Sequence, residues 1–327
     1  MDVSSVRAAS AGEWDQMWHA CAYSTYFHSR DWAEIWEAWT GGRIQPQPQV
    51  IRFADGAEAL LPLSIERAHA GLISRYVSSP GGTFGGWLSQ DELTAAHGQL
   101  LVRFLTRELP NLLWRCNPYD PLAGKVHVPR ARPDTTFVVE FENGFDTQFR
   151  RWSNGRRYDI SRARREGVTV RLAEDIDDWR RYADVYADTL RRWGTQATST
   201  HDWALFRELA QRDERVTLRL AEYRGNVIAG VVCVYSARHC ALWHSASATK
   251  YVPLRPTSLL FCEAMRDAAA RGYKRVDLNP SGGHAGVEQF KRFFAPRELQ
   301  TPVVEIRSPL ARRAAGVGAV RRAAGRR

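Results

Sequence analysis

Four short segments between residues 255 and 294 decide the fold of this sequence. In chain order they read Arg255-Pro256-Thr257-Ser258-Leu259-Leu260, Gly272-Tyr273, Val276-Asp277-Leu278 and Phe290-Lys291-Arg292-Phe293-Phe294. Proline followed by Thr257 and Ser258 is typical of a helix start, and a basic last turn before Gly272 is typical of a helix end. The segments therefore predict a helix from residue 257 or 258 to 271, then a strand, a glycine-containing loop and a short helix.

The rest of the second half of the sequence also predicts strands and helices, from its pattern of apolar residues. Expected strands lie near 168–172, 215–222, 226–235, 239–245, 275–278 and 298–306, with helices near 176–193, 201–211 and 285–294. The turn Arg224-Gly225-Asn226 joins two of these strands as a hairpin. This order predicts a mostly antiparallel sheet flanked by helices.

The first half repeats this kind of organisation. It predicts helices at 12–20, 30–39 and 91–108 and strands at 49–54, 59–66, 72–78, 112–116 and 136–141. A chain of 327 residues is also longer than one hydrophobic core usually grows. We therefore expect an α/β protein of the α+β type, with two similar domains at 1–150 and 151–309 and a basic, mobile tail at 310–327.

The net charge of +10 is concentrated in two segments. Residues 150–165 hold seven arginines and one acid, and residues 311–327 hold six arginines and no acid. The rest of the chain is close to neutral. The first cluster predicts a phosphate-binding surface, and the second an accessory tether for anions.

Several classes of protein are excluded by composition and motif. Twelve Trp, 13 Phe and 11 Tyr are far more than disordered chains contain, and no apolar run approaches the ~18 residues of a membrane span. The start of the sequence shows no secretory signal, and the odd number of cysteines, without a C-x-x-C pair, favours a reducing compartment. We expect a cytoplasmic protein. Phosphate-loop, dinucleotide and nucleophile-elbow motifs do not occur, and the nine histidines show no metal-ligand spacing, so no metal is expected.

The four opening segments resemble the C-terminal half of the FemAB-like (peptidyltransferase or acetyltransferase) branch of the GNAT acyltransferase superfamily. That branch combines a Pro-x-Ser/Asn-Leu-Leu helix start, a strand ending in Asp-Leu and a late Phe-Lys-x-x-Phe element. Arg156-Arg157 and the following residues resemble its basic helix, and segments near 27–32 and 80–86 resemble elements of its first domain. The resemblance implies tandem GNAT-like domains and an enzyme that forms amides.

Two acyl donors are compatible with this resemblance. Coenzyme-A-dependent GNAT enzymes carry an Arg/Gln-x-x-Gly-x-Gly/Ala loop that cradles the pyrophosphate, but the matching position here reads Arg255-Pro256-Thr257-Ser258 and lacks both glycines. Aminoacyl-tRNA, an ester that needs no further activation, is therefore the expected donor. The expected acceptor is an amine of a cell-wall precursor or peptide-like metabolite, either a small molecule or linked to a lipid. The donor is a co-substrate, so no cofactor is expected.

Lys291 is the first catalytic candidate. The resemblance implies that it holds a phosphate of the acceptor or donor and stabilises charge in the transition state, with Phe290 as its substrate-binding neighbour. The simpler interpretation is a solvated lysine on an amphipathic helix, whose apolar face is Phe290, Phe293 and Phe294.

Arginines form the second group of candidates. Arg156, Arg157 and Arg162 are expected to bind phosphates of the acceptor or of tRNA, and Arg255 is a further substrate-binding candidate at the helix start. An ordinary solvated basic helix explains the same pattern.

The remaining candidates also have structural alternatives. Asp277 could accept the ammonium proton or orient the amine, or it could cap the loop that follows its strand. His244 could act as a base, or it could be a core histidine with its hydrogen bonds satisfied. Ser281 and Gly282 could approach the substrate closely, or they could form a plain turn.

Three functions follow from these observations. The first is aminoacyl transfer from tRNA to an amine, and the second is N-acyl transfer from acyl-CoA to an amino sugar or polysaccharide precursor. The third is a non-catalytic nucleic-acid-binding protein that uses the two arginine clusters, although no DNA- or RNA-binding motif supports it.

Overall fold

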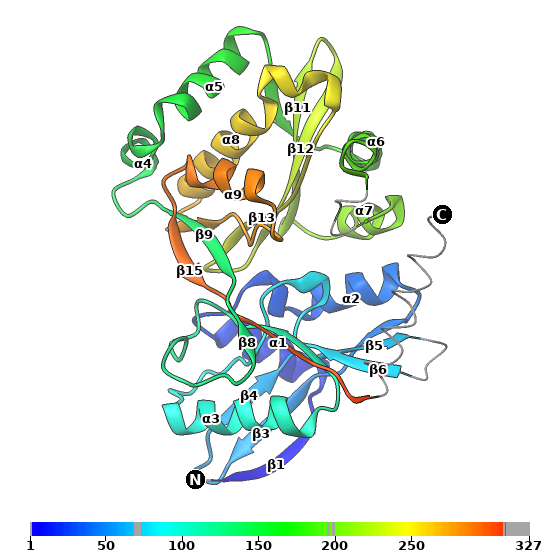
Figure 1. Ribbon diagram of the computed structural model, residues 1–327, viewed down its shortest axis with the longest axis vertical. Coiled ribbons are helices and arrows are strands. Elements are labelled where there is room, and N and C mark those ends of the chain that lie inside the picture. Colours follow the sequence, from blue (N-terminus) through cyan, green and yellow to red (C-terminus); the bar gives the residue numbers. More distant parts are fainter. Residues whose placement is uncertain (1, 69–72, 195–196, 198–199, 310, 312–327) are drawn as a thin grey trace. The chain divides into compact units, whose positions relative to one another are not determined.

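A computed structural model describes residues 2–68, 73–194, 197, 200–309 and 311 (Figure 1). It divides the chain into two compact units, Met1–Asp134 with Gln300–Arg327 and Thr135–Leu299. The prediction of two α/β units with mostly antiparallel sheets is confirmed. The predicted tail at 310–327 lies, apart from Ala311, outside the described residues.

The unit boundaries differ from those expected at 150 and 309. The predicted strand at 136–141 is β9 (Thr135–Glu140), which pairs with β14 (Arg275–Asp277) and so belongs to the second unit. The predicted strand at 298–306 is two strands, β15 (Arg297–Gln300) and β16 (Val303–Ile306). They lie in different sheets, because Pro302 interrupts the run and cannot donate to a strand ladder.

The first unit contains two sheets. Their strand orders are β1-β3-β4 and β2-β5-β6-β7-β16-β8. The strands are β1 (Val3–Ala8), β2 (Ile44–Pro46), β3 (Gln49–Phe53), β4 (Glu58–Leu61), β5 (Ser64–Ala68), β6 (Ile73–Val77), β7 (Leu112–Arg115) and β8 (Ala131–Arg132). The predicted strand at 59–66 changes sheet at Pro62, between β4 and β5. The helices are α1 (Ala11–Ala20), α2 (Arg30–Trp39) and α3 (Ala95–Arg103).

The second unit is built on one seven-stranded sheet, in the order β10-β11-β12-β13-β14-β9-β15. The remaining elements are β10 (Thr169–Leu172), β11 (Val216–Tyr223), β12 (Asn226–Tyr235), β13 (Cys240–Ser247), α4 (Phe145–Arg151), α5 (Asn154–Arg165), α6 (Ile176–Trp193), α7 (Trp203–Ala210), α8 (Pro256–Ala270) and α9 (Ala285–Arg292). Figure 1 shows α5 and α8 on one side of β11–β13 and α6 and α7 on the other. Buried residues of α8 and the sheet form the main core of this unit.

The sheet of the second unit splits at its centre. Parallel pairing of β13 with β14 is confined to Cys240 with Val276 and Ala241 with Asp277, whereas β13 continues to Ser247. The pairing of β13 with β12 shifts register beside Trp243, which is the extra residue of a β-bulge. Beyond Ala241, β13 and the chain after β14 therefore diverge and leave room for a cavity.

Candidate active site

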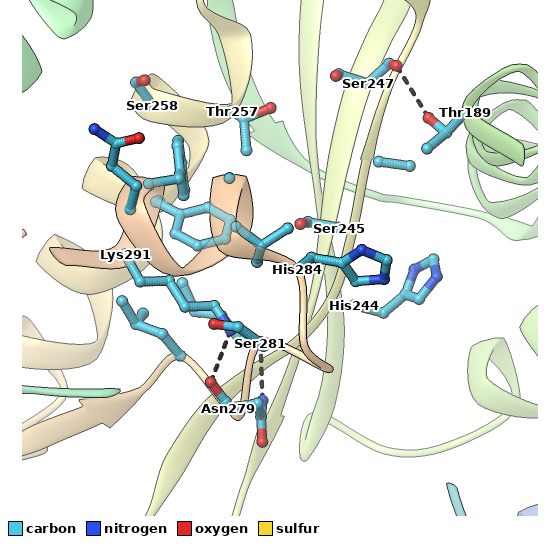
Figure 2. A pocket seen from close by; sticks show the side chains of 18 of the residues that line it. Thr189, His244, Ser245, Ser247, Thr257, Ser258, Asn279, Ser281, His284 and Lys291 are labelled. Carbon is cyan, nitrogen blue, oxygen red and sulfur yellow. Dashed lines mark hydrogen bonds between the residues drawn. The ribbon is translucent and has the colours of Figure 1, made fainter. Parts of the chain in front are cut away.

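A cavity of about 690 Å³ lies at this split, within the second unit. That volume falls within the range of about 300–1,000 Å³ that is typical of small-molecule sites. Its wall is formed by β13 from Leu242 to Ser247, the segment 278–282, the start of α8, and parts of α5, α6 and α9 (Figure 2). The cavity therefore collects side chains that are far apart in the sequence.

Most of the predicted site residues meet in this cavity. Seven of the ten line its wall: Arg156, His244, Arg255, Ser281, Gly282, Phe290 and Lys291. The other three, Arg157, Arg162 and Asp277, are not part of the wall.

Lys291 lies on α9 and is buried, with 6% of its surface exposed. Its Nζ donates to the carbonyl oxygen of Asn279 at 2.7 Å and to that of Pro280 at 3.1 Å. The interpretation as a solvated lysine is therefore wrong. The ammonium holds the turn after β14 and places a positive charge on the cavity wall (Figure 2).

Arg156 is the most buried of the predicted arginines, with 5% of its surface exposed. Its guanidinium lies 4.1 Å from the ring centre of Phe290 and 4.7 Å from that of Phe294. It donates to Ser258 Oγ and, at 3.2 Å, to the carbonyl oxygen of Phe290. Burial lowers the pKa of Arg156 to about 10. Arg156 therefore joins α5, α8 and α9 at the cavity wall rather than standing on a solvated helix face.

Asp159 links two arginines at the start of α8. One oxygen lies 3.6 Å from Arg156 Nη1 and the other 3.4 Å from Arg255 Nε. Arg255 itself has a φ of 60°, and the next residue, Pro256, has no N–H group to offer. The start of α8 therefore carries the charged side chain of Arg255 and has fewer free backbone N–H groups than an ordinary helix start.

The two arginines outside the wall lie on α5. Arg157 is half-buried and donates to Asn154 Oδ1. Arg162 is partly exposed, and its Nε lies 3.9 Å from Glu166 Oε1. Of the three predicted arginines on α5, only Arg156 is buried and lines the cavity.

Asp277 is fully buried at the end of β14. Its Oδ1 accepts from Thr136 Oγ1 at 2.5 Å and from the Asn279 backbone N–H at 2.7 Å. This geometry is that of the loop cap that the sequence left open as an alternative, and it keeps the carboxylate away from the cavity.

His244 lines the cavity from β13. Its Nδ1 lies 2.6 Å from Tyr182 Oη, and its ring packs against Tyr186 with ring centres 4.5 Å apart. Burial, together with the nearby His201, lowers the pKa of His244 well below its ordinary value. The imidazole is therefore neutral at pH 7.

A second histidine, which is absent from the predicted site residues, also lines the cavity. His284 precedes α9, and its ring lies 5.3 Å from that of Trp193 on α6. It directly follows Gly282-Gly283, and a histidine next to a flexible loop at a predicted helix start was the available signal. The wall also contains Asn279, whose Nδ2 donates to the Leu242 carbonyl oxygen at 3.0 Å and bridges the split.

No cluster of three His, Cys, Asp or Glu side chains suited to a metal occurs within the described ranges. None of the helices in the same ranges is long and apolar enough to cross a lipid bilayer.

Comparison with known proteins identifies the class. Residues 149–292 match the family described as "Acetyltransferase (GNAT) domain", and this range includes the whole cavity except Phe293. The second unit therefore contains a stretch that matches a GNAT acetyltransferase domain, and the prediction of an acyltransferase is confirmed. No curated protein matches the sequence.

Solved structures share the fold of nearly the whole chain. FemX aligns with a TM-score of 0.66 at 11% identity, over 91% of this chain and 96% of FemX. L-PGS from Bacillus licheniformis aligns at 0.54 and 12% identity, over 93% of each chain. A conserved protein of unknown function from Bacteroides thetaiotaomicron VPI-5482 aligns at 0.56 and 12% identity, over 92% of this chain and 99% of that one.

Proposed function

We propose that this enzyme transfers an aminoacyl group from aminoacyl-tRNA to an amine of a cell-wall precursor or a peptide-like metabolite, in the cytoplasm. The observation that carries the proposal is the cavity at the split between β13 and β14 in a chain with the fold of FemX along nearly its whole length. The GNAT domain favours this catalytic function over a non-catalytic nucleic-acid-binding one.

The start of α8 supports tRNA over acyl-CoA as the donor. Pro256 has no N–H, and the N–H of Ser258 is already bonded to the Arg255 carbonyl oxygen at 3.1 Å. A pyrophosphate would therefore find fewer free backbone amides here than in a glycine-rich loop. Arg255, which is partly exposed, can instead bind the phosphodiester of a nucleic-acid end by charge.

Lys291 supports the transfer step itself. When an amine attacks the ester carbonyl, negative charge develops on the carbonyl oxygen, and a fixed positive group at the cavity wall stabilises it. The bonds of Nζ to two carbonyl oxygens fix the ammonium before the substrate arrives. Orientation of the two substrates in one cavity supplies a further large share of the rate.

The basic face of α5 provides a surface for tRNA. Arg164 and Arg165 are exposed next to the partly exposed Arg162, and exposed Tyr158 lies beneath Arg165 at 5.7 Å. Aromatic and arginine side chains together are suited to phosphates and unpaired bases.

The test is a transfer assay with two donor pools. The protein is incubated with charged tRNA or with acyl-CoA and a mixture of amine acceptors, and mass spectrometry detects the mass gained by an amine. We expect transfer from charged tRNA that RNase abolishes and that weakens steeply with ionic strength. Transfer from acyl-CoA that RNase leaves unchanged would contradict the donor assignment.

Acyl-CoA remains the second candidate donor, with an amino sugar or polysaccharide precursor as acceptor. The match to a GNAT acetyltransferase domain is the observation that favours it. The same assay separates the two donors.

A further inference from the structure

The turn between β14 and α9 is held in a defined shape. Asn279, Gly282 and Gly283 all have positive φ, at 59°, 60° and 81°. Lys291 bonds the carbonyl oxygens of residues 279 and 280, and the His284 N–H donates to the Ser281 carbonyl oxygen at 3.1 Å. The side chains of Ser281 and His284 are therefore set in place on the cavity wall (Figure 2).

Two polar atoms of this turn have no hydrogen-bond partner among the described residues. They are Ser281 Oγ and His284 Nε2, and both atoms are buried. A buried polar atom without a partner costs about 1–3 kcal/mol, so native structures rarely keep one unless a ligand or water satisfies it. Both residues line the cavity that we assign to the substrates.

His284 differs from His244, the other histidine of the cavity wall. Nδ1 of His244 is bonded to Tyr182, and its ring is enclosed by Tyr186 and Phe206. The ring of His284 packs against Trp193, and its Nε2 has no hydrogen-bond partner within the described chain. Of the two imidazoles, His284 is thus the one with a ring nitrogen left for a substrate.

We propose that His284 is the general base of the reaction, and that Nε2 takes a proton from the attacking amine. This inference rests on the proposed amide-forming function, with either donor. The amine nitrogen forms a bond to the carbonyl carbon, and the bond from that carbon to the leaving oxygen or sulfur breaks. The proton passes from the amine to Nε2 and then to the leaving atom, so no other reactant is needed. Ser281 Oγ accepts a hydrogen bond from the amine and keeps it beside Nε2.

The charged side chains around His284 are mostly positive. The other charged or titratable side chains of the wall are Arg156 and Asp159 on α5, Tyr186 and Arg192 on α6, His244 on β13, Arg255 before α8 and Lys291 on α9. Glu288 lies one turn along α9 but is paired with Arg292 at 2.8 Å. The proton that Nε2 takes up passes to the leaving atom as the bond between that atom and the carbonyl carbon breaks, and the imidazole becomes neutral again.

The test compares H284Q and H284A with a matched H19Q variant, whose histidine is exposed on α1. With whichever donor is active, we expect H284Q to lower kcat by about 100-fold or more, with KM within about 3-fold of wild type. The acidic limb of the pH profile of kcat/KM should disappear in H284Q, and added imidazole should restore part of the activity of H284A. H19Q should behave as wild type, and all three variants should melt within about 2 °C of it.

The outcomes separate this inference from the proposed function. An active wild type with an unchanged acidic limb in H284Q, and a kcat within about 3-fold, overturns the role of His284 and leaves the proposed function standing. A wild type that uses acyl-CoA overturns the donor assignment, while the same variants still test His284. A wild type that transfers from neither donor overturns both proposals.

Discussion

The ammonium of Lys291 lies 2.7 Å from the carbonyl oxygen of Asn279, and this contact ties α9 to the turn that follows β14. Asn279 has a positive φ of 59°, and its N–H is bonded to Asp277, so the turn is held from both ends. The lysine that the resemblance marks as catalytic is therefore also the residue that shapes the neighbouring wall of the cavity.

Replacement of Lys291 by Gln should lower kcat/KM by about 100-fold, because the fixed positive charge is lost. The protein should also melt at a lower temperature, since Gln can satisfy at most part of the two carbonyl oxygens. Single-turnover amide formation and thermal denaturation measure the two effects. Arg292→Gln, which changes an exposed neighbour, is the matched control. Undiminished amide formation in the folded K291Q variant would rule out a catalytic Lys291.

Arg156→Gln should destabilise the fold by about 3–5 kcal/mol, because it removes one partner of a buried ionic and hydrogen-bonded group. The cation–π contacts with Phe290 and Phe294 are lost as well. Urea denaturation measures this cost. A variant as stable as wild type would show that Arg156 does not hold α5, α8 and α9 together.

Arg162→Gln should leave stability within about 0.5 kcal/mol of wild type, since the side chain is partly exposed and only distantly paired. If α5 contacts tRNA, the slope of log affinity against log salt should fall by about 1. Filter binding of charged tRNA at several salt concentrations measures the slope. An unchanged slope would place the tRNA elsewhere on the chain.

The sequence predicted the elements of the second unit well, because the residues that decide them act locally. Pro256 begins α8, and Gly272, which has a positive φ, follows its end. The apolar residues from Val227 to Tyr235 form most of β12. The strand at 298–306 failed because its two halves pair with strands from different units. Which strand each half pairs with depends on residues far away in the sequence, so a local sequence pattern does not predict it.

The residues that line the candidate site were predicted only in part, because burial and strand pairing are also properties of the folded chain. The resemblance pointed to Lys291 and Arg156, but it could not show that their side chains are buried. The places of Asp277 and His284 depend on how β13 and β14 diverge. Beyond that split Asp277 bonds the Asn279 N–H, and His284 forms part of the cavity wall. The pairing of β13 with β14 in the folded sheet decides on which side of the loop Asp277 and His284 lie, and the sequence alone does not show this pairing.

Gly230→Ala should destabilise the protein by about 1–3 kcal/mol through overpacking. A Cβ at residue 230 would lie 2.4 Å from Cδ2 of Tyr182, a buried ring that must then move away from its bond to His244. Gly155→Ala on α5 is the control, because no atom lies within 4 Å of its added Cβ. Thermal denaturation of both variants checks the difference. Equal stability of G230A and wild type would mean that Tyr182 can shift at no cost.

Stability should fall as the pH drops from 7 to 5, and His244 should account for part of the loss. Burial lowers the pKa of His244 well below its ordinary value and that of His201 to about 4, whereas an unfolded histidine titrates near 6.5. Between these values the unfolded chain binds more protons than the folded one, so the free energy of unfolding rises with pH. Replacement of His244 by Gln removes one of these groups. Urea denaturation at pH 7, 6 and 5 should therefore show a smaller loss in H244Q than in wild type, by up to about 2 kcal/mol, while H19Q keeps the wild-type dependence. Parallel curves for H244Q and wild type would mean that His244 takes up its proton in the folded protein as readily as in the unfolded chain.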